Sequence, residues 1–183
     1  AIAESFAQLG YTVIGTSRSE FKFESNLDNL IPLALDIADR NSINNCVEYL
    51  KDNNLKPSIL INNAGITSDQ LFLRMKDEEW KKVVDINLMG VINCLSSVIS
   101  EMKKNKGGHL MIVSSPAGYR GLPGAGIYGV TKSAVTFLAE TIKLEYEKFN
   151  IKVQVVHPGF VKTPATSMLS IQTPVKSALS AVL

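Results

Sequence analysis

Tyr128 and Lys132 are the residues whose types and spacing point most directly to chemistry in this chain. They stand four positions apart, so on a helix the phenol and the ammonium group project from one face. A free phenol, with a pKa of about 10, is a poor acid or base at neutral pH, but a fixed neighbouring cation lowers that pKa. Ser115 lies thirteen residues before the tyrosine, and its hydroxyl could orient a carbonyl oxygen against the phenol. The spacing therefore predicts acid–base catalysis.

The composition is that of a globular protein with a hydrophobic core. The chain has 183 residues, of which 45% are hydrophobic and 7% aromatic, and we expect a single domain over residues 1–183. Its 19 basic and 17 acidic residues are mostly interspersed, which disfavours a nucleic-acid partner. No apolar stretch approaches 18 residues, so we expect no membrane span. Cys46 and Cys94 lack a CxxC spacing and are predicted to be reduced core thiols.

Apolar segments of strand-like and helix-like pattern alternate along the chain. Strands are predicted at residues 11–15, 31–35, 58–61, 110–114 and 152–156. Helices are predicted at residues 1–9, from 39 or 42 to about 52, 77–104 with Asp77 as its cap, and 127–149. The strands are nearly all apolar and the intervals suit crossover connections, which indicates a parallel sheet covered on both faces. We therefore expect an α/β fold, a three-layer α/β/α Rossmann-like doubly wound sheet.

Polar residues follow several of the predicted strands. Asp36, the Asn-Asn-Ala-Gly turn at 62–65, the pair Ser114-Ser115 and the pair Pro158-Gly159 each stand at the carboxyl end of a strand. Ligands of open parallel sheets bind outside these ends. We therefore expect these four segments to meet at one edge of the sheet and to form a single site.

These landmarks, in this order, resemble the short-chain dehydrogenase/reductase family. The resemblance covers the chain from Ile2 to at least Thr163, and it includes Asn87 in the middle of the long helix. The stretch 62–90 is especially similar to bacterial-type 3-oxoacyl-acyl-carrier-protein reductases. The resemblance implies an oxidoreductase that interconverts carbonyl and alcohol groups with a nicotinamide cofactor.

The resemblance also implies a role for each landmark. Tyr128 would protonate the carbonyl oxygen, and Lys132 would lower the pKa of the phenol and bind the nicotinamide ribose. Ser115 would hold the substrate oxygen, while Asn87 would support a water-linked proton relay to the lysine. The residues implied to bind the cofactor are Arg18, Asp36, Asn63, Ala64, Gly65, Tyr128, Lys132, Pro158, Gly159, Val161 and Thr163.

The choice of cofactor can be argued from charge. An acid at the end of the second strand of the family would accept a hydrogen bond from a ribose 2′-hydroxyl and repel a 2′-phosphate. This chain has Thr16-Ser17-Arg18-Ser19 there, and a guanidinium can pair with a phosphate. We therefore predict NADP(H) over NAD(H). No metal is expected, because His109 and His157 are far apart and lack ligand company.

The chain departs from the family at both ends. It opens on Ala1, inside a predicted helix, so the Gly-rich phosphate-binding turn and the first strand of the family are not in this sequence, nor is the final strand. A fragment of a longer product, an incomplete chain and a truncated non-catalytic relative are the explanations that compete. We expect a cytoplasmic protein, although the N-terminus leaves organelle targeting open.

The primary hypothesis is an NADPH-dependent carbonyl reductase, acting on 3-oxoacyl groups of a carrier protein in fatty acid synthesis. The alternatives are another alcohol, sugar or steroid dehydrogenase, or a related module that binds or assembles without turnover. The two long helices, 77–104 and 127–149, resemble those that pair subunits in the family, which implies a homodimer or homotetramer.

Overall fold

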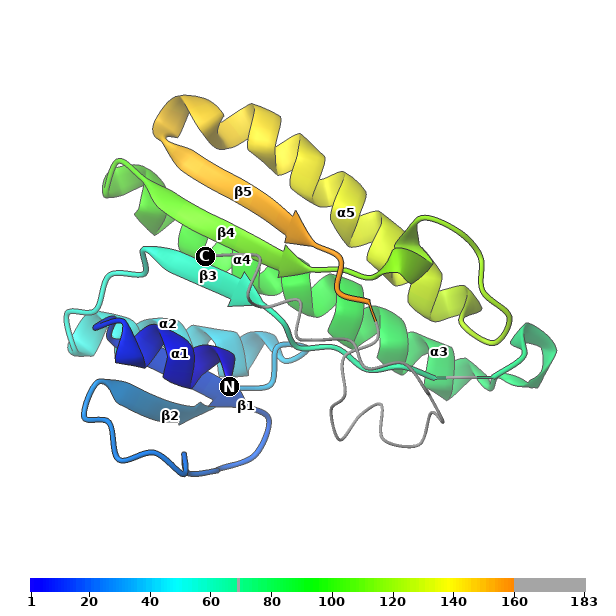
Figure 1. Ribbon diagram of the computed structural model, residues 1–183, viewed down its shortest axis with the longest axis horizontal. Coiled ribbons are helices and arrows are strands. Elements are labelled where there is room, and N and C mark those ends of the chain that lie inside the picture. Colours follow the sequence, from blue (N-terminus) through cyan, green and yellow to red (C-terminus); the bar gives the residue numbers. More distant parts are fainter. Residues whose placement is uncertain (69, 160–183) are drawn as a thin grey trace.

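The computed structural model describes residues 1–68 and 70–159, and their strands form two parallel sheets. One sheet pairs β1 (Val13–Ser17) with β2 (Leu30–Ala34). The other has the order β3 (Ile59–Asn62), β4 (Gly108–Val113), β5 (Ile151–Val156). Within the described residues no strand pairing joins β1 to β3. All strand ends that carry the candidate residues point the same way (Figure 1).

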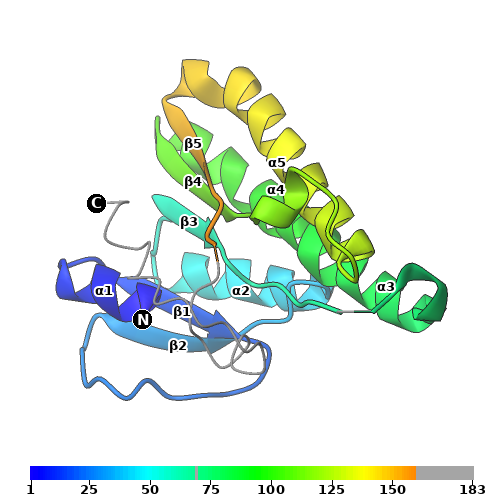
Figure 2. The same ribbon diagram turned by 45° about the vertical axis from the view of Figure 1, so that its right-hand side comes forward.

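Helices cover both faces of these strands. In Figure 1, α1 (Ile2–Gln8) lies in front of the strands, while α2 (Arg40–Asp52) and α4 (Gly90–Lys104) lie behind them, and the turned view of Figure 2 agrees. The remaining helices are α3 (Asp77–Val84) and α5 (Gly126–Tyr146), the latter packed along β5. This arrangement confirms the predicted α/β fold with helices on both sides of a parallel sheet.

The hydrophobic core lies between the three-stranded sheet and the helices α4 and α5. Because parallel strands are covered on both faces, the middle strand β4 is apolar from Leu110 to Val113, and Leu110 and Ile112 are fully buried. An apolar stripe on α4 supplies the other half of the core, and its members Val91, Leu95, Val98 and Met102 are all buried. Cys94 is also buried and Cys46 is half-buried, both as free thiols, as predicted. Burial raises the pKa of the Cys94 thiol to about 11.

The helix predicted over residues 77–104 is interrupted at its centre. A π-helical segment, Asp85–Met89, joins α3 to α4, and it places Asn87 in the interior. A π segment shifts the side chains that follow it, and such segments are frequent at functional sites. Taken together the helical residues Asp77–Lys104 are long and apolar enough to cross a membrane by length and composition alone, but nearly half of the window is packed inside the protein. That burial is the pattern of a core helix.

Several predicted boundaries were wrong by one or two residues or more. Asp77 does not cap α3; its N-cap is Lys76, whose backbone N–H donates to the carboxylate of Glu79 at 2.9 Å. The predicted loop after residue 15 begins later, because Thr16 and Ser17 belong to β1. Of the two predicted starts of α2, residues 39 and 42, the structure uses the first. Asp39 is the N-cap, and its side chain accepts from Asn41 N at 2.9 Å.

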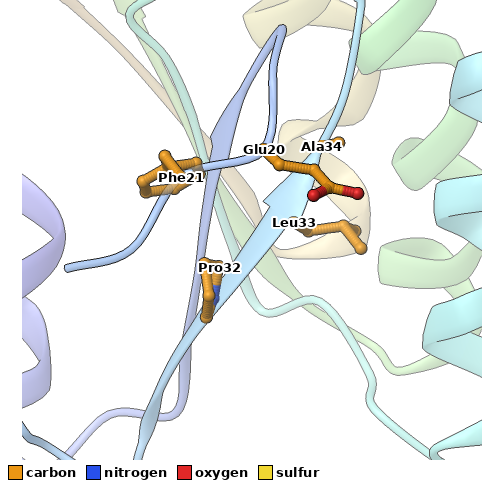
Figure 3. Close-up of a pocket in the computed structure, with 5 residues that line it drawn as sticks. All are labelled: Glu20, Phe21, Pro32, Leu33 and Ala34. Carbon is orange, nitrogen blue, oxygen red and sulfur yellow. The ribbon is translucent and has the colours of Figure 1, made fainter.

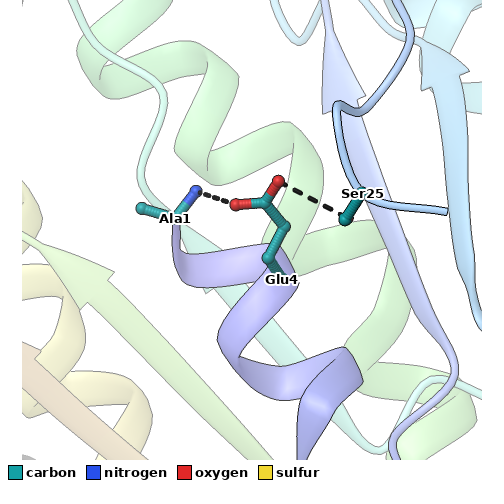
Figure 4. Close-up of polar contacts among 3 residues, drawn as sticks. All are labelled: Ala1, Glu4 and Ser25. Atoms are coloured by element: carbon teal, nitrogen blue, oxygen red, sulfur yellow. Dashed lines mark hydrogen bonds and ion pairs between the residues drawn. The ribbon is translucent and has the colours of Figure 1, made fainter. Parts of the chain in front are cut away.

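The first helix is fastened to the loop that follows β1. Glu4 accepts from the amino group of Ala1 at 3.0 Å and from the hydroxyl of Ser25 at 3.5 Å (Figure 4). Asn29, at the end of the same loop, donates to Ala7 O and Tyr11 O, each at 2.8 Å. These contacts fold the loop between β1 and β2 back over the sheet, with Phe23 covering Gly15.

Candidate active site

The buried amine of Lys132 is the centre of the site. Lys132 is 6% exposed, and its Nζ donates to the carbonyl of Val113, the last residue of β4, at 2.8 Å. The amine lies 5.7 Å from the centroid of the Tyr128 ring, one helical turn earlier on α5. Burial lowers the pKa of Lys132, because the charged form loses hydration. The predicted pairing of cation and phenol on one helix face is therefore present.

Asn87 clamps the turn after β3. Its Oδ1 accepts from Ile66 N at 2.8 Å, and its Nδ2 donates to Ile66 O at 2.8 Å and to Thr131 Oγ1 at 3.3 Å. Thr131 lies next to Lys132 and donates in turn to Tyr128 O at 2.7 Å. The fully buried amide thus ties the turn and α5 together. These contacts assign it a positional task; the proton relay stays a prediction.

Gly65 brings the turn after β3 against Asn87 and Lys132. A Cβ added to it would lie 3.3 Å from Asn87 Oδ1 and 3.6 Å from Lys132 Nζ. Asn63, Ala64 and Gly65 are exposed, so their backbone is open at the edge of the sheet. A side chain at position 65 would occupy space directly over the amine, which is where a ligand bound by Lys132 would have to approach.

The two serines after β4 have different tasks. Ser114 is buried, and its hydroxyl donates to Lys132 O at 3.0 Å and lies 2.9 Å from Thr136 Oγ1, so it fastens α5 to the sheet. Ser115 is only half-buried, has an extended backbone and accepts from Ala117 N at 3.2 Å through its hydroxyl oxygen. Within the described residues its hydroxyl hydrogen has no acceptor, so it can donate, as the predicted contact with a substrate oxygen requires.

The residues predicted for the adenosine half of the cofactor lie at the same edge, with fewer contacts. Arg18 directly follows β1 and is exposed. Asp36 follows β2 by two positions; its Oδ1 accepts from Ala38 N and its backbone N–H donates to Ser42 Oγ, both at 3.0 Å. Part of its carboxylate is therefore already used to shape the loop.

The end of β5 completes the edge. His157 follows that strand directly, and Pro158 and Gly159 come next, so the predicted pair lies at the carboxyl end of β5. Val161 and Thr163 lie outside the described residues.

Two residues near this edge were given no role of their own by sequence reasoning, although Asn62 belongs to the predicted segment 62–65. Asn62, the last residue of β3, is buried, and its Nδ2 has no hydrogen-bond partner within residues 1–68 and 70–159. Glu20 lines a hollow of about 370 Å³ with Phe21 and the β2 residues Pro32, Leu33 and Ala34 (Figure 3). The unpaired donor of Asn62 suits a polar ligand at the edge, whereas the carboxylate of Glu20 adds a negative charge two positions from Arg18.

The two hollows described here do not coincide with Tyr128 and Lys132. A second one, of about 340 Å³, lies between the loop 117–121 and the face of α5 that carries Gly126, Gly129 and Ser133. On a helix that face is opposite to the one with Tyr128 and Lys132. The candidate site is thus recognised from its side chains and from the strand ends that carry them, and not from a deep pocket. Within the part of the chain that the structure describes, no three His, Cys, Asp or Glu side chains gather as a metal site would need.

The chain belongs to the short-chain dehydrogenases. The family model described as short chain dehydrogenase matches residues 1–173. The chain is 38% identical over 175 residues to the 3-oxoacyl-[acyl-carrier-protein] reductase FabG of Thermotoga maritima, covering 90% of this chain and 70% of that protein. Among solved structures it is similar to ElxO with NADP bound (TM-score 0.81, 31% identity, 89% of this chain and 69% of that one). It is also similar to 4-hydroxyisoleucine dehydrogenase complexed with NADH (TM-score 0.81, 28% identity, 88% and 70%).

These similarities confirm the predicted family, the Rossmann-like fold and the class of activity, an oxidoreductase. The cofactor prediction, NADP(H), agrees with the NADP-bound relative. The residues described here fit a nicotinamide dinucleotide, because a buried amine, an open Gly65 backbone, an unpaired Asn62 donor and an exposed Arg18 share one edge. The individual residue roles stay predictions.

Proposed function

We propose that the protein reduces a carbonyl group to an alcohol with NADPH, and that Tyr128 is its general acid. The observation that carries this proposal is the placement of Lys132 Nζ, buried beside the Tyr128 ring and held by Val113 O at 2.8 Å. A cation fixed in that position stabilises the phenolate that remains after proton transfer. NADPH, when bound, would supply the hydride.

The other residues orient the reacting groups. Ser115 donates its hydroxyl hydrogen to the substrate oxygen, so that the oxygen faces the phenol of Tyr128. Asn87 keeps the turn 63–66 against α5 through its two bonds to Ile66, and this leaves the backbone of Gly65 open above Lys132. Holding donor and acceptor at a fixed geometry is where most of the rate enhancement of such a site would arise.

We further propose that the substrate is a 3-oxoacyl thioester, carried by an acyl carrier protein. The similarity to FabG of Thermotoga maritima supports it. Another alcohol, sugar or steroid dehydrogenase and a module without turnover are the rivals. NADPH consumption by the intact protein should be measured with a 3-oxoacyl carrier protein, a 3-oxoacyl coenzyme A and a ketose. Preference for the ketose, or no consumption with either thioester, would refute the thioester. No consumption with any of the three, nor with a ketosteroid or a simple ketone, would refute the reductase.

The NADPH preference rests on Arg18, which is exposed where the family binds the adenosine ribose. Binding of NADPH and NADH should be compared by cofactor fluorescence. Tighter binding of NADH would overturn this part of the proposal.

A homodimer or homotetramer is proposed from α5. Val130, Phe137 and Leu144 stand seven residues apart and are 62%, 72% and 79% exposed. Seven residues are nearly two helical turns, so they form one apolar stripe. Phe137→Lys should convert the oligomer to monomer in light scattering, while Lys143→Glu, at an exposed position on another face of the same helix, should not. A monomeric wild-type protein would refute the proposal.

We place the protein in the cytoplasm. Cys46 and Cys94 are both free thiols, which suits a reducing compartment.

A further inference from the structure

The backbone ladder between β4 and β5 stops at the candidate site. Its last bond runs from Ser114 N to Val156 O at 2.8 Å. In a parallel ladder the next donor would be the N–H of residue 158, but this residue is Pro158 and has none. Pro116 likewise removes the donor after Ser115. The backbone therefore does not hold Ser115 to the segment that follows β5.

Beyond the end of the ladder, the side chain of His157 connects the segment after β5 to Ser115. Its Nδ1 lies 3.3 Å from Ser115 O, which also accepts from Gly118 N at 3.0 Å. The imidazole packs against the Tyr119 ring, with centroids 4.3 Å apart and the planes tilted by 33°. Tyr119 is 69% exposed, and its ring contacts the protein at His157.

We propose that His157 is a positioning residue for Ser115. Its imidazole fixes the Ser115 carbonyl by a hydrogen bond and the loop 116–119 by stacking on Tyr119. His157 also immediately precedes Pro158-Gly159 in the chain. It therefore connects Ser115, which would hold the substrate oxygen, to the segment that would face the nicotinamide. This inference rests on the proposed function for the role of Ser115.

The hydrogen bond defines the tautomer. A carbonyl oxygen can only accept, so Nδ1 must carry the proton. The contact is thus testable without a substrate. In the full chain labelled with ¹⁵N-histidine, NMR should show a protonated Nδ1 for His157. The chain has only two histidines, and the spectrum of His109→Gln assigns them. An unprotonated Nδ1 would overturn the contact.

Two substitutions separate the hydrogen bond from the ring. His157→Phe keeps an aromatic ring against Tyr119 but removes the donor, whereas His157→Asn keeps an N–H at the same distance from Cβ. We expect kcat of the Phe variant to fall about tenfold or more, with KM for NADPH changed by less than about threefold, because a small misplacement of a substrate-orienting group lowers the rate. The Asn variant should recover to within about threefold of wild type.

His109→Phe is the matched control, since His109 lies at the opposite end of β4 from Ser115. It should leave kcat unchanged. Equal losses in the Phe and Asn variants, or no loss in either, would overturn the positioning role. A Tm measured for each variant shows whether a lost rate is lost folding. If the wild-type protein consumes no NADPH, the proposed function and the positioning role both fall, while the NMR result still decides the contact.

Discussion

The two ends of the cofactor edge are built differently. At the end predicted to be catalytic, Asn87, Thr131 and Lys132 are buried, and hydrogen bonds from three elements fix them. At the end predicted to hold the adenosine, Arg18 is exposed, and within the described residues the carboxylate of Asp36 bonds only to Ala38 N in its own loop. Groups that act on a transition state benefit from being held in place before the ligand arrives. Groups that only hold a cofactor can be ordered by the cofactor itself, at some cost in affinity.

The largest expected effect is on the catalytic end. Tyr128→Phe removes the transferable proton and keeps the ring, so turnover should fall by about 10²-fold or more while NADPH binding is retained. Turnover from NADPH absorbance and affinity from NADPH fluorescence give the two numbers. Tyr119→Phe, which changes an exposed phenol near the same site, should leave turnover unchanged. A Tyr128→Phe variant that reduces the substrate at the wild-type rate would show that another group donates the proton.

Asn87→Ala tests the preorganisation directly. It leaves the N–H and the carbonyl of the half-buried Ile66 without these partners, so the free energy of unfolding should fall by about 3 kcal/mol. Denaturant titration measures it. Asn93→Ala, in the following helix α4, removes a single bond to Ile37 O and should cost only about 1 kcal/mol. Equal losses in the free energy of unfolding of the two variants would contradict the role of Asn87 in holding the turn.

Arg18→Ala should weaken NADPH binding by about 2 kcal/mol and leave NADH nearly unchanged, since only NADPH carries a 2′-phosphate. The free energy of unfolding should not change, because Arg18 is exposed. Glu20→Gln should do the opposite and tighten NADPH binding, because it removes a negative charge close to Arg18 in sequence. Parallel loss of both cofactors in Arg18→Ala would contradict the assignment to the 2′-phosphate.

The smallest expected effect is that of Lys132 on the pH dependence of the free energy of unfolding. Burial lowers its pKa below the ordinary 10.5, so the folded state releases the proton before the unfolded state does. Below the lowered pKa both states are charged and the folded protein bears the full desolvation cost. As pH rises toward 10.5 this cost disappears, so the wild type should gain stability relative to Lys132→Met.

At neutral pH the two proteins should be equally stable within about 1 kcal/mol, while the variant should lack turnover. Urea titrations at neutral and alkaline pH measure the difference, and the other lysines cancel between the two proteins. If the wild type instead lost stability relative to Lys132→Met as pH rises, the result would contradict a pKa of Lys132 lowered by burial.

Local patterns in the sequence predicted much of this protein. The alternation of apolar segments predicts parallel strands with covering helices, and the spacing of four predicts that Tyr128 and Lys132 share a face. The strand ends predict which polar residues meet, because parallel strands finish at one edge. These features depend on backbone periodicity and chain direction, which are local properties.

The tertiary structure decided which of these residues are fixed and by what. Asn87 holds the turn through Ile66, 21 positions away, and Thr131, 44 positions away. The same kind of contact separates buried Ser114 from Ser115, two residues that look alike in sequence, and brings His157 to Ser115 across 42 positions. The π segment that turns Asn87 inward has no local signal either. Hydrogen bonds between distant segments depend on how the elements pack, and no periodicity within one element encodes them.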